Sequence, residues 1–162
     1  MMRPFILCLT LGFLCIVAGC GFHLRGQAAL PSSLATPYLE ASDHYTPLYA
    51  ALGARLRAAG AKLATGPAAA SVVIHLHVDD TGRELLSVSA RNTPGEFEVH
   101  YTVEYSVSAG EQELLARQQL SLTRDYSYDE SAVLAKEHEE QSLRAALADE
   151  LAGLMLRRLA TL

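Results

Sequence analysis

The stretch FEVHYTVEYSVS, residues 97–108, alternates apolar and polar side chains without a break. Successive side chains of a β-strand point to opposite faces of the sheet, so this period of two predicts a strand with one buried face. The residues that share the apolar face are Phe97, Val99, Tyr101, Val103, Tyr105 and Val107. We therefore expect this strand to lie against a core on one side and to present a polar face on the other.

Two neighbouring segments show the same period. The segment at 72–79 places Val72, Ile74, Leu76 and Val78 on one face, and the segment at 114–128 does so with Leu114, Ala116, Leu120, Leu122, Tyr126 and Tyr128. Short turn-forming sequences at 93–95 and 109–111 connect the three, which predicts an antiparallel meander. A short strand is also expected at 38–41.

The period changes to that of a helix on both sides of the meander. Thr46 and Pro47 suit the start of a helix that carries leucines every fourth residue and ends at Gly60. A longer helix is expected over 131–159, with a buried stripe of Val133, Leu143, Leu147, Leu151, Leu154 and Met155. The order βαβββα predicts an α+β fold, a two-layer sandwich in which both helices cover one face of a mainly antiparallel sheet of about four strands.

The N-terminus resembles a bacterial lipoprotein signal. Arg3 precedes an apolar segment at 5–17, and Val17-Ala18-Gly19-Cys20 places small residues before a cysteine. This pattern predicts removal of residues 1–19 and lipidation of Cys20, with Gly21 favouring the outer membrane over the inner one. The alternatives are an ordinary secretory signal with a chance cysteine, or an uncleaved anchor helix.

The remaining sequence predicts an anchor and connector at 20–36 and one globular domain at 37–162. All three cysteines lie within residues 1–20, so the expected body has no disulfide and no thiolate site. Without Arg3, 12 basic residues stand against 18 acidic ones, a net charge of −6. Neither this balance nor any basic stripe favours a nucleic-acid partner.

Catalytic and metal-binding motifs are weak in this sequence. His75, His77 and His100 belong to polar strand faces and could approach one another, but polar strand positions explain them as well. His138 starts a zincin-like pattern that fails because Ser142 stands where the second histidine is needed. We expect no enzyme activity, no metal and no cofactor apart from the covalent lipid on Cys20.

Three short motifs carry a family resemblance. Arg91-Asn92 precedes the long alternating strand, which opens with Glu96-Phe97, and Leu134-Ala135-Lys136 opens the last helix. The most specific motif is Cys20-Gly21-Phe22-His23-Leu24-Arg25-Gly26. In these motifs and in element order, the chain is similar to the LptE (RlpB) family of lipopolysaccharide-assembly lipoproteins.

That resemblance implies a role as a partner and plug rather than as an enzyme. A member of the family sits one to one inside the β-barrel LptD, is anchored to the outer membrane from the periplasmic side, and binds lipopolysaccharide. The basic positions implicated in that binding correspond to Arg91 and Lys136. The alternative function is that of an outer-membrane lipoprotein acting as a lipid carrier or as an adaptor of another envelope complex. A carrier needs an apolar cavity, which about four strands do not readily enclose.

Overall fold

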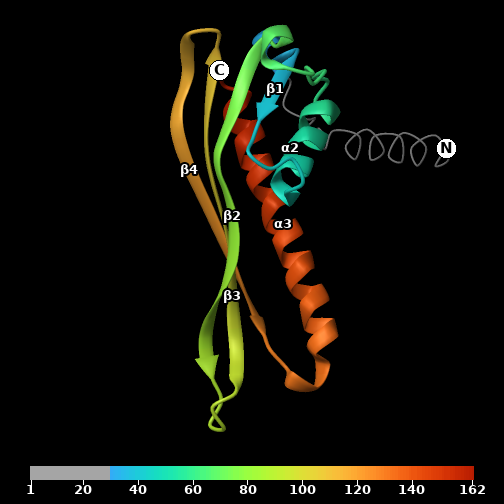
Figure 1. Ribbon diagram of the computed structural model, residues 1–162, viewed down its shortest axis with the longest axis vertical. Coiled ribbons are helices and arrows are strands. Elements are labelled where there is room, and N and C mark those ends of the chain that lie inside the picture. The colour runs from blue at the N-terminus through green and yellow to red at the C-terminus, as the bar shows by residue number, and fades with distance from the viewer. Residues whose placement is uncertain (1–29) are drawn as a thin grey trace, which may run out of the picture.

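A computed structural model describes residues 30–162 and shows one four-stranded sheet covered on one side by two helices (Figure 1). Cys20, the predicted lipidation residue, and the motif at 21–26 lie outside the described residues. None of the helices within residues 30–162 is long and apolar enough to cross a membrane.

The sheet has the strand order β1-β2-β3-β4. The short strand β1 (Pro37–Glu40) runs parallel to β2 (Val72–Val88). Strand β2 pairs antiparallel with β3 (Pro94–Ala109), which pairs antiparallel with β4 (Gln112–Ser127). The predicted meander and the order βαβββα are therefore confirmed.

The two helices begin and end for identifiable reasons. Helix α2 (Pro47–Ala58) is capped by Thr46, whose hydroxyl accepts a hydrogen bond of 3.1 Å from the Tyr49 N–H. It is followed by Gly60, whose φ of +94° suits a residue without a Cβ. Helix α3 (Val133–Leu159) follows a 3-10 turn at Glu130–Ala132, where the Asp129 carboxylate accepts from the Ser131 N–H at 2.9 Å.

The core lies between the two helices and the sheet. Strand β3 contributes its whole alternating apolar face from Val99 to Val107, as its period predicts. The helices contribute Leu48, Leu52, Leu56, Leu147, Leu151, Met155 and Leu159. Burial of these side chains supplies the main driving force for a body without cysteines. The predicted fold class, an α+β two-layer sandwich, is confirmed.

Two bulges shift side chains to faces that simple alternation does not predict. On β2, Leu76 pairs with Tyr105 and Val78 with Glu104, so one extra residue enters β2 between them. The prediction that Val78 shares the buried face is therefore wrong, and Asp79 faces the helices instead. There the Asp79 carboxylate accepts a hydrogen bond of 2.7 Å from the Tyr101 hydroxyl.

A bulge on β4 has the same effect. Tyr105 pairs with Gln118 and Val107 with Leu115, so β4 advances three residues while β3 advances two. Leu115 is buried as a result, whereas Ala116, predicted on the buried face, is exposed. At the start of α3, Val133 is also not part of the buried stripe: it is 42% exposed.

Candidate functional site

Arg91 lies in the turn that joins β2 to β3. The turn spans residues 89–93 and is closed by a hydrogen bond of 2.8 Å from the Ser89 N–H to the Thr93 carbonyl. Asn92 adopts a φ of +61°, which asparagine tolerates better than most residues. The predicted turn at 93–95 is thus displaced, because Pro94 and Gly95 already belong to β3. Arg91 itself is exposed and forms no ion pair with any described residue.

Lys136 lies in the first turn of α3, at the same end of the molecule as the β2–β3 turn (Figure 1). Its ammonium group donates a hydrogen bond of 2.8 Å to the Glu139 carboxylate, and its side chain is 18% exposed. Lys136 is thus tied to its own helix, whereas Arg91 is free. We call this part of the body, with the β2–β3 turn and the start of α3, the distal end.

A shallow pocket of about 550 Å³ opens at the distal end. Its lining includes Ser89, Arg91, Thr93, Tyr128, Asp129 and Ser131. The pKa of Asp129 lies below its ordinary value, because Ser131 donates to the carboxylate from its hydroxyl and its N–H and because Lys136 is near. The structure therefore places Arg91 in the lining of a polar pocket and Lys136 in the neighbouring first turn of α3, where its charge acts on Asp129.

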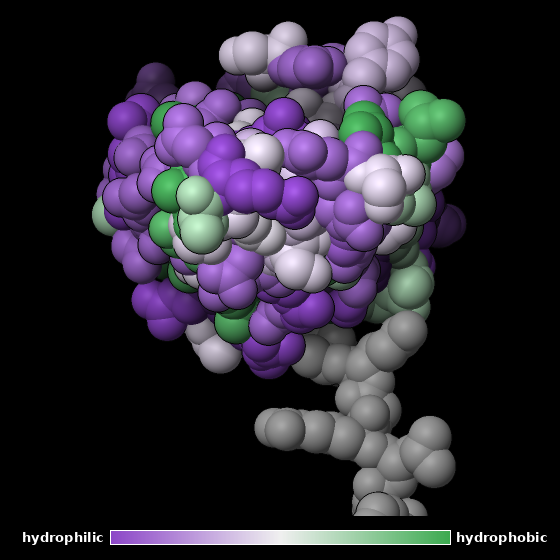
Figure 2. All heavy atoms as spheres, turned by 90° about the horizontal axis from the view of Figure 1, so that it is seen from below, coloured by the Kyte–Doolittle hydropathy of each residue, from purple (hydrophilic) through white to green (hydrophobic). Residues whose placement is uncertain are grey.

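The surroundings of the pocket are mainly hydrophilic. Figure 2 looks directly onto the distal end and shows polar residues over most of it, with a few apolar residues among them. Carboxylates are frequent here, including those of Asp129, Glu130, Glu137 and Glu139. An anionic ligand must therefore contact the cations locally, because the surface as a whole does not attract it.

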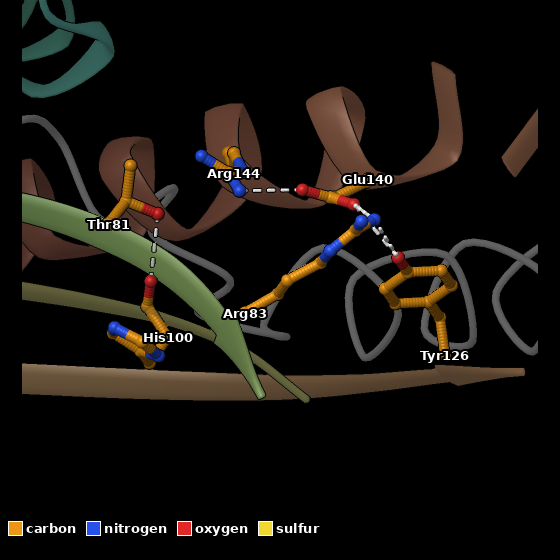
Figure 3. A network of polar contacts seen from close by, with 6 residues as sticks. All are labelled: Thr81, Arg83, His100, Tyr126, Glu140 and Arg144. Atoms are coloured by element: carbon orange, nitrogen blue, oxygen red, sulfur yellow. Dashed lines mark hydrogen bonds and ion pairs between the residues drawn. The ribbon is translucent and has the colours of Figure 1, made fainter. Parts of the chain in front are cut away.

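A polar network fixes the first half of α3 against the sheet (Figure 3). The Glu140 carboxylate accepts hydrogen bonds of 2.8 Å from the Tyr126 hydroxyl, 2.7 Å from Arg83 and 2.6 Å from Arg144. Arg83 also lies over the Phe97 ring, with its central carbon 4.8 Å from the ring centroid. Burial raises the pKa of Glu140, but these donors more than offset it and hold the pKa below its ordinary value.

The sequence indicates only one part of this network. Glu140 and Arg144 are four residues apart on a helix, so their pairing is predictable. Arg83 and Tyr126 contribute from strands β2 and β4, 57 and 14 residues before Glu140, and no helical spacing predicts these contacts. The network matters for the site because it sets the position of the α3 start, and hence of Lys136, relative to the β2–β3 turn.

The His75 and His77 rings stack with their centroids 6.0 Å apart, but His100 does not join them. His75 contacts Glu40 and hydrogen-bonds Ser108 at 2.9 Å, and His77 hydrogen-bonds Ser106 at 2.8 Å. His100 lies further along β3, opposite Gly82. Partial burial, followed by the Arg117 and His75 charges, lowers the pKa of His77. Within residues 30–162, no group of three histidines, cysteines or carboxylates is arranged to hold a metal ion.

The sheet face opposite the helices is polar and uncovered by any described helix or strand (Figure 1). It carries hydroxyl pairs such as Thr102 and Ser121, whose oxygens are 2.9 Å apart. Charges on this face are partly paired, as between Arg117 and Glu104 at 3.4 Å. A broad polar face of this kind suits contact with another polar surface.

Comparison with known proteins identifies the family. Residues 34–159 match the LptE family, described as lipopolysaccharide-assembly. The chain belongs to the LptE family. It is 33% identical to the LPS-assembly lipoprotein LptE of Pectobacterium atrosepticum, over 99% of this chain and 86% of the relative. It is 28% identical to that of Yersinia enterocolitica, over 98% of this chain and 77% of the relative.

Solved structures agree with this membership. Lipoprotein B from Nitrosomonas europaea, determined by NMR, aligns with a TM-score of 0.70 at 25% identity, covering 86% of this chain and 90% of that one. The crystal structure of the rare lipoprotein B from Shewanella oneidensis gives 0.67 at 27% identity, covering 78% and 94%. The resemblance to the LptE family predicted from sequence motifs is therefore confirmed. The chain belongs to a family of lipoproteins involved in lipopolysaccharide assembly. Arg91 and Lys136 both lie within the range that matches the family.

Proposed function

We propose that this protein is an outer-membrane lipoprotein that assembles with the LptD β-barrel, plugs its lumen, and assists the delivery of lipopolysaccharide to the outer leaflet. The observation that carries this proposal is the family match over residues 34–159, which includes nearly the whole described body. The role is one of assembly and binding rather than catalysis.

The surface of the body supports the plug. The lumen of a large outer-membrane barrel is polar, so a body that occupies it needs polar outer faces. The uncovered sheet face provides such polar groups. It carries the hydroxyls of Thr102, Ser121 and Ser106, the His77 ring, and the ion pair of Arg117 with Glu104. We propose one such body for each barrel, a one-to-one complex.

The anchor supports placement at the membrane. We propose that the mature chain begins at lipidated Cys20 and that residues 20–36 connect the lipid to a single domain at 37–162. Several acyl chains on one residue, each contributing about 0.8 kcal/mol per buried methylene, would hold the protein permanently. The end of this connector packs on the body, because Leu34 is fully buried in the core.

Lipopolysaccharide contact is proposed for Arg91 and Lys136. Lipid A phosphates accept charge-assisted hydrogen bonds, and arginine can donate two in a fork. Arg91 is free to do so, because it has no ion-pair partner among the described residues. Lys136 would exchange its bond with Glu139 for one with the ligand.

Affinity purification of the intact lipoprotein from detergent-solubilised outer membrane tests the assembly. We expect one large β-barrel to copurify in stoichiometric amount. Recovery of the lipoprotein with lipid alone would support the carrier function instead, and recovery with a different envelope complex would support the adaptor function. Either result would overturn the proposed plug.

A further inference from the structure

The end of the body opposite the distal end carries most of its unpaired cations. We call it the proximal end; it comprises the loop after α2, the β3–β4 turn and the end of α3 (Figure 1). Of the eleven lysines and arginines within residues 30–162, six form ion pairs with other described residues and five do not. One of the five is Arg91. The other four lie at the proximal end and are all exposed: Arg57, Lys62, Arg157 and Arg158.

Three separate segments bring these four cations to the same end. Arg57 lies in the last turn of α2, and Arg157 and Arg158 lie in the last turn of α3, which runs from the distal to the proximal end (Figure 1). Lys62 lies in the loop after α2, where its N–H donates a hydrogen bond of 2.9 Å to the Ala35 carbonyl. The cations are therefore gathered by the fold and not by one run of sequence.

The two segments that supply these cations contain no acidic residue. Residues 44–78 have three cations and no aspartate or glutamate, and residues 151–162 have two arginines and neither acid. Carboxylates enter the proximal end from Glu111 and Glu113, at the β3–β4 turn. Because the chain as a whole is acidic, this end differs from the rest of the body in the sign of its charge.

Helix dipoles account for only part of this arrangement. The C-terminus of a helix carries a partial negative charge, which cations in the last turn offset. Lys62, however, lies outside both helices, in a loop at 60–71 that is rich in alanine and has no other charge. Pro67, Ala68 and Ala69 of this loop are exposed. Cations beside small uncharged side chains form a surface that can approach a layer of lipid head groups closely.

The chain that leads to the predicted anchor enters the body beside these cations. Leu30 packs against the core, and five residues later Ala35 accepts the hydrogen bond from Lys62. The ten residues from Cys20 to 29 extend to at most about 35 Å. With lipid on Cys20, the proximal end stays within that distance of the leaflet, so head groups are present at a high effective concentration.

We propose that the proximal end binds the anionic head groups of phospholipids in the leaflet that holds the anchor, through Arg57, Lys62, Arg157 and Arg158. The proposal rests on the proposed anchoring at Cys20 and adds a second, electrostatic contact with the membrane. Each cation beside an anionic lipid surface strengthens binding by about fivefold. Two contacts with one leaflet would orient the body, with the distal end directed away from the lipid.

An acidic protein is the alternative partner for a basic surface. The tether favours the lipid, because it holds head groups within reach of this end whether or not another protein is present. The alternative is kept as an outcome of the experiment.

Energy transfer from the full-length lipoprotein, held by its own anchor in vesicles, tests the proposal. One kind of vesicle is phosphatidylcholine alone, and in the other about a third of the lipid is phosphatidylglycerol. A dye on Thr161→Cys reports how close the proximal end lies to labelled head groups, and a dye on Leu134→Cys reports the same for the distal end. Both positions are exposed, and no cysteine follows residue 20 in the native sequence.

Charge reversal separates the proximal cations from the net charge of the protein. The first variant is Arg157→Glu with Arg158→Glu. A second variant, Arg57→Glu with Lys62→Glu, repeats the test on another segment and serves if the first one unfolds. The matched control is Arg91→Glu with Arg124→Glu, which changes the net charge equally outside the proximal end. The melting temperature of each variant confirms folding.

We expect energy transfer from Thr161→Cys to rise on the anionic vesicles alone and to be lost at high salt. Both proximal variants should lose this rise, the control should keep it, and Leu134→Cys should show none. Equal transfer on the two kinds of vesicle, or equal loss in the proximal variants and the control, would overturn the inference and leave the anchor intact. The same holds if the proximal variants keep the lipid contact but lose the barrel, which would show a protein-docking surface. A lipoprotein that leaves both kinds of vesicle would overturn the proposed anchor itself, and the inference with it.

Discussion

The Tyr126 hydroxyl donates a hydrogen bond of 2.8 Å to the Glu140 carboxylate, which links the last strand to the last helix. Arg83 and Arg144 donate to the same carboxylate from either side, and only 12% of the Glu140 side chain is exposed. The two cations and the phenol therefore depend on one anion, which holds the start of α3 beside the β2–β3 turn.

Replacement of Glu140 by Gln should lower the free energy of unfolding by about 1–3 kcal/mol, because two arginines lose their charged partner in a poorly solvated place. Denaturant titration measures the loss. Glu139→Gln is the control, since its side chain is 45% exposed and its pair with Lys136 is worth less than about 1 kcal/mol. An equal effect of both substitutions would contradict the importance of the network.

The contribution of Glu140 should depend on pH in a definite direction. Its pKa in the folded protein lies below the ordinary value of 4.5, because the hydrogen bonds outweigh burial. The stabilisation is therefore complete above pH 4.5 and disappears as the pH falls through the folded pKa. We expect the difference in melting temperature between wild type and Glu140→Gln to be constant near neutrality and to shrink in acid. A difference in melting temperature that grows in acid would contradict this prediction.

The His100 ring on the neighbouring strand occupies the space that a side chain at Gly82 would need. A Cβ at this position would lie 2.7 Å from the His100 ring. Gly82→Ala should therefore force the His100 ring to move, at a cost of about 0.5–1.5 kcal/mol in the native background, and should cost little or nothing when His100 is also replaced by Ala. A double-mutant cycle by denaturant unfolding measures this. The same cost in both backgrounds would show that the ring is not the cause.

Periodicity was enough to predict the layers of this fold but not their local irregularities. The alternation from Phe97 to Val107 and the leucine spacing of α2 are direct consequences of strand and helix geometry. The bulges near Val78 and Leu115 are not visible in that alternation, because an extra residue in one strand depends on the pairing with its neighbour. The bulge near Val78 turns Asp79 rather than Val78 toward the helices, and the bulge near Leu115 buries Leu115 rather than Ala116.

The candidate site was only partly predictable for a similar reason. The family resemblance indicates Arg91 and Lys136, and the structure places them in the β2–β3 turn and in the first turn of α3. The pocket that Arg91 lines is formed by turns that are far apart in the sequence, so the positions of Tyr128 and Ser131 in it emerge only from the fold. Val133 follows the helical period yet is exposed, because the first turn of α3 extends beyond the core.

The ligand role of the two cations is tested by replacing both Arg91 and Lys136 with Asp. Repulsion with lipid A phosphate and the loss of charged hydrogen bonds should weaken lipopolysaccharide binding by about 1–3 kcal/mol for each bond lost. Arg91→Lys with Lys136→Arg is the charge-preserving control. The melting temperature and the copurification of the barrel should stay unchanged in both double variants. Undiminished lipopolysaccharide affinity would refute the ligand role, and a collapsed melting temperature would show that these residues support the fold.

The predicted anchor has a direct chemical test. Cys20→Ala should abolish labelling with palmitate and release the body into the periplasm, because no other cysteine follows residue 20. Cys15→Ala, within the segment expected to be removed, is the control and should leave labelling intact. Label that persists in the Cys20 variant would exclude this residue as the acylation site.

Site-specific photo-crosslinking from the uncovered sheet face tests the central claim most directly. A photoreactive residue is placed at Thr102 or at Ser121, which are neighbours in the middle of that face. If the body plugs LptD, irradiation of intact cells should join the lipoprotein to one large β-barrel from both positions. Labelling of soluble periplasmic proteins alone, from both positions, would contradict the account.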